Sequence, residues 1–413
     1  MLTPQSRIAI VGGGPAGLTL GLLLHKQNIP FTIFELRPKP SDEEFSQPSG
    51  SLDLHEHSGI AALKACGLFE QAMALTGDCT QEQKIADKSG NIIYEDAVGD
   101  DRPEIYRHDL TKLLTSHLPT ASIQWSHKLI DAKRVTTSGT SAIELDFGIH
   151  GKHAFDLVVG ADGAWSRVRA LLTDVKPHYV GIHNITMTIR QMTTKYPELL
   201  ALVGHGTFFS LADKHGVFAQ RASQDSARMY IMLSTEDKDY TSTSGLAGKT
   251  PVQAKDLLVG DGAMLNPWGE IIKQLIAVAC EDESAHNGGA NLDIKPFYTL
   301  PAGHSWDHQA NATLIGDAAH LMNPPAGEGV NIAMRDALLL SEAIIKAYKA
   351  ESLDNDTFQH VLDTGIKDFE VDMAARAVEM AEGTREVSEV MFGTDDGAMA
   401  MANWFRTMFE VAA

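Results

Sequence analysis

The chain has 413 residues, of which 44% are hydrophobic and 21% charged, and its formal net charge is −20. This composition is typical of a globular protein, and the length allows about two or three domains, which excludes a single small binding module. Nucleic acid is not expected as a partner, because an acidic surface repels phosphate backbones and no Lys/Arg-rich run reverses the charge locally.

The first forty residues predict the start of a doubly wound α/β sheet. A buried strand at 8–11 leads into a glycine turn at 12–17, an apolar helix at 18–25 and a second strand at 31–35. Short apolar runs rich in Ile and Val are typical of parallel strands that are buried on both faces. Similar runs at 156–160 and 312–316 indicate that the sheet is assembled from distant segments.

The glycine turn has the form Gly12-x-Gly14-x-x-Gly17 and stands between a strand and a helix. Gly12 permits the tight turn, Gly14 lets backbone N–H groups approach a pyrophosphate, and Gly17 lets the helix pack on the strand. Glu35, at the end of the next strand, is placed to accept hydrogen bonds from ribose hydroxyls. The pattern favours dinucleotide binding over a plain turn, but it does not distinguish FAD from NAD.

Between about 180 and 300 the pattern changes to antiparallel strands at 186–189, 216–219 and 229–233, separated by polar turns. This indicates an inserted second domain. From about 354 to 392 apolar residues recur with helical spacing, which predicts a long C-terminal helix that braces the two domains.

Two further segments place polar groups at strand ends. Asp162 begins an Asp-Gly-x-x-Ser-x-x-Arg pattern, which fits a cofactor-binding turn and an ordinary capped turn equally well. Asp317 also follows a strand, and Gly327 and Gly329 open a long helix. An Asp there can accept hydrogen bonds from ribityl hydroxyls, and the helix start can hold the pyrimidine edge of a flavin.

With these three segments in order, the sequence resembles the group A flavoprotein aromatic monooxygenases up to about residue 390. It is similar to the tetracycline-inactivating members, because it also carries Gly-Ser-Leu-Asp-Leu-His at 50–55 and the stretch 102–110, from Arg102 to Leu110. The resemblance implies a discontinuous Rossmann-like FAD-binding domain (1–74, 104–178 and 290–349). It also implies a mainly antiparallel substrate-binding domain (75–103 and 179–289) and a helical segment (350–413).

Carried over residue by residue, the resemblance implies a set of FAD contacts. They are Gly12, Gly14, Pro15, Ala16, Gly17, Glu35, Arg37, Asp53, Arg107, Asp162, Asp317, Gly327, Gly329, Val330 and Asn331. Arg37 departs from the family pattern, since the family places its Arg directly after the acid, where this chain has Leu36.

The resemblance also implies substrate contacts from Thr186, Phe208, Met229, Pro324, Pro325 and Met391. The first three stand where the tetracycline enzymes carry an amide, a cation and an imidazole, so a more apolar pocket is expected. An Arg that the family links to nicotinamide use is missing, with Ser46 near its place.

The remaining candidates favour structural roles. His55 with His57, and His304 with His308, are not completed by a Cys or carboxylate cluster, so no metal site is expected. His320 is also expected to be structural, and no side-chain acid or base for catalysis is identified. Cys66, Cys79 and Cys280 form no Cys-x-x-Cys pair and are expected to be buried, reduced thiols.

The resulting hypothesis is that NADPH or NADH reduces bound FAD, and that the reduced flavin uses O2 to hydroxylate a phenolic or polycyclic small molecule. A tetracycline-like compound is one candidate. Arg107 and the helix start at 327–331 are the candidate donors to the reduced ring. The alternatives are an FAD-dependent reductase or dehydrogenase and a non-catalytic flavin- or ligand-binding protein.

A cytoplasmic monomer without a membrane partner is expected. The first strand begins within ten residues of Met1, which leaves no room for a secretory signal. The apolar stretches are also too short to cross a bilayer.

Overall fold

The computed structural model describes residues 7–76, 80, 82–96, 103–137, 140–350 and 355–412. Five strands form a parallel sheet in the order β17-β11-β1-β2-β7. They are β1 (Ile8–Val11), β2 (Phe31–Phe34), β7 (Ile123–Gln124), β11 (Leu157–Gly160) and β17 (Ala312–Leu314). Segments far apart in the sequence therefore lie side by side, which confirms the predicted doubly wound sheet.

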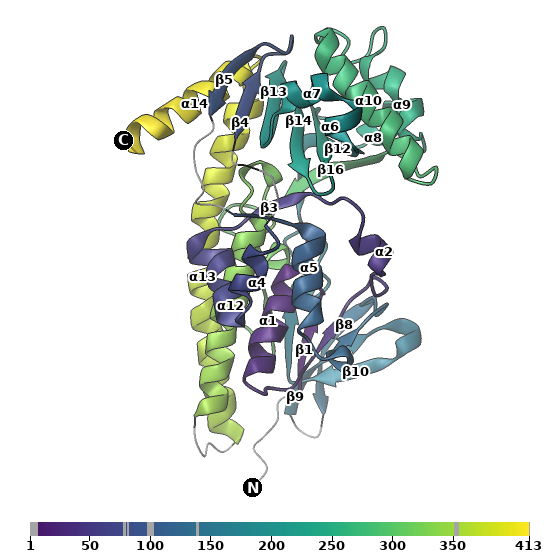
Figure 1. Cartoon of the computed structure of the whole chain (residues 1–413). Coiled ribbons are helices and arrows are strands. Elements are labelled where there is room, and N and C mark those ends of the chain that lie inside the picture. Colours follow the sequence, from purple (N-terminus) through teal and green to yellow (C-terminus); the bar gives the residue numbers. More distant parts are fainter. Residues whose placement is uncertain are drawn as a thin grey trace.

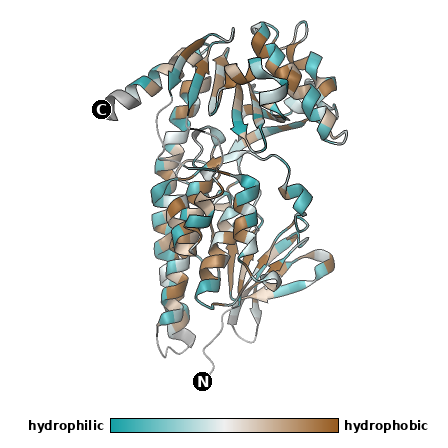
Figure 2. Ribbon diagram, viewed as in Figure 1, coloured by the Kyte–Doolittle hydropathy of each residue, from teal (hydrophilic) through white to brown (hydrophobic). Residues whose placement is uncertain are grey.

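Helices α1 (Pro15–Lys26), α5 (Arg107–Ser116) and α12 (Gly329–Lys349) cover this sheet. α1 contacts both α5 and α12, and it is buried without interruption from Ala16 to Leu24. Figure 2 shows hydrophobic residues concentrated on α1 and the neighbouring strands. A three-stranded antiparallel sheet lies beside this body in Figure 1; its strands are β8 (Asp131–Thr137), β9 (Thr140–Asp146) and β10 (Lys152–Phe155).

Short elements connect these parts. They are α2 (Asp42–Phe45), β3 (Ser51–Asp53), η1 (Glu56–Ile60), α3 (Ala61–Cys66), α4 (Phe69–Met73), β6 (Glu104–Tyr106), η2 (Thr120–Ser122), η3 (Gly148–His150), η4 (Arg169–Leu171), α11 (Asp317–His320) and η5 (Pro324–Ala326). β3 and β6 pair antiparallel, so the Asp53 segment lies beside the strand that leads into Arg107.

A seven-stranded sheet forms the second body, in the order β16-β12-β15-β14-β13-β4-β5. Its strands are β4 (Gln83–Ala86), β5 (Ile92–Asp96), β12 (His178–Ile189), β13 (Thr207–Ala212), β14 (His215–Ala222), β15 (Ser226–Ser234) and β16 (Asp293–Thr299). All of its pairs are antiparallel except β4 with β13. β16 falls within the segment 290–349 expected for the FAD-binding domain, but it pairs with β12 of the seven-stranded sheet.

The two faces of the seven-stranded sheet have different coverings. One face, the helix-covered face, packs under α7 (Pro197–Val203), α9 (Pro251–Val259) and α10 (Glu270–His286), near the short helices α6 (Met192–Lys195) and α8 (Tyr240–Thr243). The other face, here called the α13 face, includes Ile182, Leu211, Phe218, Met232 and Met391. Successive side chains of each strand point to opposite faces, so each strand contributes to both.

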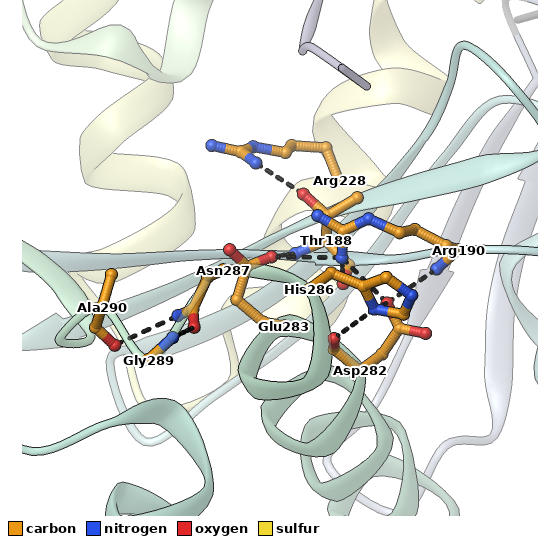
Figure 3. A network of polar contacts seen from close by, with 9 residues as sticks. All are labelled: Thr188, Arg190, Arg228, Asp282, Glu283, His286, Asn287, Gly289 and Ala290. Atoms are coloured by element: carbon orange, nitrogen blue, oxygen red, sulfur yellow. Dashed lines mark hydrogen bonds and ion pairs between the residues drawn. The ribbon is translucent and has the colours of Figure 1, made fainter. Parts of the chain in front are cut away.

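The end of β12 is closed by α10 rather than by another strand. Pairing with β16 reaches only as far as Thr186. Beyond it, the backbone N–H of Thr188 donates to Glu283 at 2.9 Å and that of Arg190 donates to Asp282 at 3.2 Å, as Figure 3 shows. Arg190 also pairs with the buried Asp282 through its guanidinium at 2.9 Å. These contacts satisfy edge N–H groups and fasten the helix layer to the sheet.

The long helix α13 (Asn355–Phe392) runs beside both bodies in Figure 1. It contacts α12 in the first body and β13 and β14 in the second, which confirms the predicted brace. The last helix, α14 (Gly397–Ala412), packs on β4, β5 and β13.

Cys66 and Cys280 are buried and unpaired, and burial raises the pKa of each thiol to about 12, as expected for inert cysteines. Cys79 and Arg102 lie outside the described residues. Within the described chain, no helix has the length and apolarity needed to cross a membrane. The same part of the chain holds no group of three or more potential metal ligands.

Candidate functional site

The glycine turn is shaped by close backbone approaches. Gly12 has φ +114°, and a Cβ there would lie 2.1 Å from the carbonyl oxygen of Ala161. A Cβ on Gly17 would lie equally close to the carbonyl oxygen of Gly12. A Cβ on Gly14, by contrast, would meet nothing within 4 Å, although this residue caps α1. The turn is thus closed on the protein side and open in front of the α1 N-terminus, where a pyrophosphate fits.

Glu35 is held at the end of β2 by the glycine turn and by Arg37. Its Oε2 accepts from the N–H of Gly13 at 2.7 Å, and its Oε1 accepts from the Arg37 N–H at 3.0 Å and Nε at 2.8 Å. The Glu35 side chain is almost fully buried, whereas Arg37 is 66% exposed. A ribose at this place would meet the remaining lone pairs of Glu35 and the Arg37 guanidinium together.

The Asp162 carboxylate forms its hydrogen bonds within its own loop. One carboxylate oxygen accepts from Ser166 Oγ at 2.5 Å and the other accepts from the N–H of Arg167 at 2.8 Å. These bonds favour the capped turn among the two alternatives for this motif. The buried Arg169 then donates to the carbonyl oxygens of Ala164 and Ala318, so the Asp162 loop supports α11.

Asp317 and Arg107 offer unused polar groups on the other side of the turn. The Asp317 side chain is open to solvent but surrounded by protein on most sides. This desolvation raises its pKa, and the positive charges of His320 and Arg107 oppose the rise. Within the described residues, neither the Asp317 carboxylate nor the Arg107 guanidinium has a hydrogen-bond partner. A ligand with hydroxyl groups, such as a ribityl chain, fits the free carboxylate.

The third part of the site is the start of α12. Gly327 and Gly329 are exposed, and a Cβ on Gly329 would meet nothing within 4 Å. The first N–H groups of this 21-residue helix have no partner within the helix, and the helix dipole makes this end positive. Gly316, before Asp317, approaches α1, since a Cβ on Gly316 would lie 3.5 Å from the Ala16 Cβ. The predicted first and third motifs therefore adjoin, and their residues fit FAD.

The side chain of Asn331 has a structural role. It is 1% exposed, it donates to the carbonyl oxygen of Asp53 at 3.0 Å, and its Oδ1 accepts from the N–H of His55 at 2.9 Å. Asn331 therefore joins the Asp53 segment to the start of α12. Any contact with a flavin would come from the backbone N–H groups of Val330 and Asn331.

A buried charge network behind Asp317 was not predicted. Asp336 of α12 is fully buried and accepts from the N–H of Gly316 at 3.0 Å, His320 Nε2 at 2.5 Å and Arg376 Nη1 of α13 at 3.0 Å. Burial opposes protonation of His320, but the Asp336 carboxylate raises its pKa above the usual value. The bond between His320 and the buried Asp336 supports the expected structural role. The sequence did carry a sign of this network, because Asp336 is a charged residue among the apolar positions of α12.

Phe208 and Met229, two of the predicted substrate contacts, lie on the helix-covered face of the seven-stranded sheet. Phe208 and Met229 are fully buried in the core under α7, α9 and α10. A one-residue difference in alignment exchanges the two faces of a strand. Their neighbours Phe209 and Tyr230 lie on the α13 face instead. Phe208 and Met229 therefore lie on the face opposite to the α13 face, and their contact with a substrate stays a prediction.

The α13 face meets the cofactor motifs at Gly50. Thr186 is half-buried and stands opposite Tyr230 in the β12–β15 register. A Cβ on Gly50 would lie 2.8 Å from the Tyr230 hydroxyl and 3.6 Å from Arg107 Nε. The Tyr230 hydroxyl has no hydrogen-bond partner among the described residues. It is a free polar group beside Thr186, on a face that also carries the apolar side chains of Phe218 and Met232.

The other predicted substrate residues lie around this junction. Met391 is buried on the α13 face beside Phe218 and Met232. In η5, Pro324 is exposed and Pro325 is half-buried. η5 also packs against α13. These three positions stay predictions.

Comparison with known proteins agrees with this geometry. A family described as "FAD binding domain" matches residues 5–257 and 306–361. The monooxygenase penA of Penicillium thymicola is 35% identical over 89% of this chain and 91% of its own length. Klebsiella pneumoniae HpxO, solved with FAD and uric acid, has a TM-score of 0.74 and 16% identity over 99% of this chain and 94% of its own. The tetracycline destructase Tet(55) has a TM-score of 0.66 and 17% identity over 92% of this chain and 90% of its own. At such identities the two structures report the fold alone.

Proposed function

Because this chain belongs to the FAD-binding-domain family and is an FAD-dependent monooxygenase, we propose that it uses NADPH or NADH and O2 to hydroxylate an aromatic or polycyclic small molecule. The observation that carries the proposal is the junction at Gly50, where the apolar α13 face meets Arg107 and the cofactor motifs. A flat ring held there would lie between that face and the flavin site. We further propose that the parallel-sheet body binds FAD and the seven-stranded sheet binds the substrate.

The proposed reaction divides the work between cofactor and chain. FAD, once bound and reduced, supplies the activation of O2. The start of α12 at Gly327–Gly329 presents N–H groups and the positive end of the helix dipole, which stabilise negative charge on the reduced ring. Arg107, without a hydrogen-bond partner among the described residues, adds a fixed positive charge. Asp317 would accept hydrogen bonds from ribityl hydroxyls and so help to hold the cofactor.

The α13 face supplies the surroundings of the substrate. Phe209, Phe218 and Phe297 together with Met232 make it apolar, which excludes water from the reacting ring. Tyr230 is the polar group that would orient the substrate, by donating a hydrogen bond to a ring oxygen. A tetracycline-like compound is one candidate of this class, but the apolar side chains Phe209, Phe218 and Met232 favour less polar rings.

The flavin absorbance of the purified protein tests the proposal. On anaerobic addition of NADPH we expect bleaching, and we expect it to be faster with an accepted ring compound than without one. In air, NADPH oxidation should then be coupled to O2 consumption and hydroxylated product. Bleaching without any coupled O2 uptake would favour a reductase, and a protein that binds FAD but is not reduced would favour a binding protein.

A single substitution tests the cofactor site itself. Asp317→Ala removes the free carboxylate, so the variant should purify with little FAD, measured by the ratio of flavin to protein absorbance. The matched control is Asp307→Ala, an exposed acid in the preceding loop, which should keep its flavin. Full flavin content in Asp317→Ala would refute the role of this residue.

A further inference from the structure

His55 joins two acidic side chains from distant parts of the chain. Its Nε2 lies 2.8 Å from Asp53 Oδ2 on β3, and its Nδ1 lies 3.3 Å from Glu328 Oε2 at the residue before α12. Asp53 and Glu328 are the titratable groups that face the ring. A neutral imidazole carries one N–H donor, whereas an imidazolium carries two and can serve both carboxylates at once.

One of the two segments that His55 joins, the start of α12, borders the flavin ring in the proposed function, and the other contains Asp53, a predicted FAD contact. A Cβ on Gly327 would lie 3.2 Å from Asp53 Oδ1, so the Asp53 carboxylate adjoins the turn before α12. Asn331 ties the same segments through backbone groups, but that tie does not titrate. The His55 ring is partly open, with 19% of its side chain exposed. Its charge is thus the part of this connection that can change with pH.

We propose that His55 is a positioning residue for the flavin, which as an imidazolium clamps Asp53 against Glu328 and so makes cofactor affinity depend on pH. This inference rests on the proposed FAD site. With the proton present the cluster has a net charge of −1, and without it −2, and FAD is itself an anion because of its pyrophosphate. Loss of the proton therefore both loosens the clamp and adds repulsion toward the cofactor.

The direction of the pH effect follows from the two carboxylates. The hydrogen bond to Asp53, followed by that to Glu328, raises the pKa of His55 to about 9, against the opposing effect of burial. Because the free imidazole has an ordinary pKa of 6.5, the clamp is complete near neutral pH and is lost as the pH rises through about 9.

The test follows release of FAD from the diluted, FAD-loaded full chain by its fluorescence, between pH 7 and 10. We expect the dissociation constant of the unmodified protein to rise roughly tenfold per pH unit above pH 9. His55→Gln should bind FAD more weakly at pH 7 and lose this inflection. The matched control is His57→Gln, an exposed neighbour outside the cluster, which should keep the original profile.

Two outcomes separate this inference from its premise. If the unmodified protein does not hold FAD at any pH, the proposed FAD site fails and the inference fails with it. If it holds FAD, and His55→Gln shows the same inflection as the unmodified protein, the inference alone is overturned. Glu328→Gln gives a second measurement that does not depend on His55→Gln folding: it should move the inflection to lower pH, and an unmoved inflection would also overturn the clamp.

Discussion

The buried network around Asp336 allows a quantitative prediction. Asp336→Asn keeps the size of the side chain but removes its charge, while His320 and Arg376 stay 6% and 13% exposed. A buried ion pair that loses one partner costs about 3–5 kcal/mol, because the remaining charge stays desolvated. We expect a loss of that size in the free energy of unfolding, and a lower flavin content, since the N–H of Gly316 beside Asp317 loses a charged acceptor.

Arg376 also provides the control for this experiment. Its Nε pairs at 2.8 Å with Asp372, whose side chain is 59% exposed. Exposed pairs contribute at most about 1 kcal/mol, so Asp372→Asn should be nearly neutral. Urea unfolding followed by circular dichroism measures both variants. A cost below about 1 kcal/mol for Asp336→Asn, or equal costs for the two variants, would refute the reasoning.

Two further substitutions probe the turn and the sheet. Gly17→Ala places a Cβ 2.1 Å from the Gly12 carbonyl oxygen, so the folded variant should purify with little FAD, and normal flavin content would contradict this. Phe208→Ala should lower the free energy of unfolding by about 3–5 kcal/mol, measured in urea, yet leave substrate affinity unchanged. Tyr230→Phe should weaken substrate binding and leave the free energy of unfolding nearly unchanged. A substrate affinity that falls in Phe208→Ala but not in Tyr230→Phe would contradict the assignment of faces.

Sequence patterns predicted the parts of the site whose chemistry is local. The glycine turn, Glu35 and Asp317 each stand at the end of a short buried strand, and parallel strands bring such ends to one edge. The pattern also predicted α12 correctly from Gly327 and Gly329, since the helix begins at Gly329.

The missed residues depend on tertiary contacts. The face of the sheet on which Phe208 and Met229 lie could not be predicted, because an alignment without landmarks leaves the register of a strand open by one residue. Asp336 and Arg376 are 40 positions apart, and no local spacing links them. His55 was read as a packing or surface residue because its second acidic partner, Glu328, comes from another part of the chain.

The continuous helix α13 has a structural consequence. Arg376 near its middle donates to Asp336, and Met391 near its end packs on the α13 face of the seven-stranded sheet. Because both residues lie on one continuous helix, α13 joins the charge network behind Asp317 to the α13 face of the seven-stranded sheet, and the two bodies share this single element.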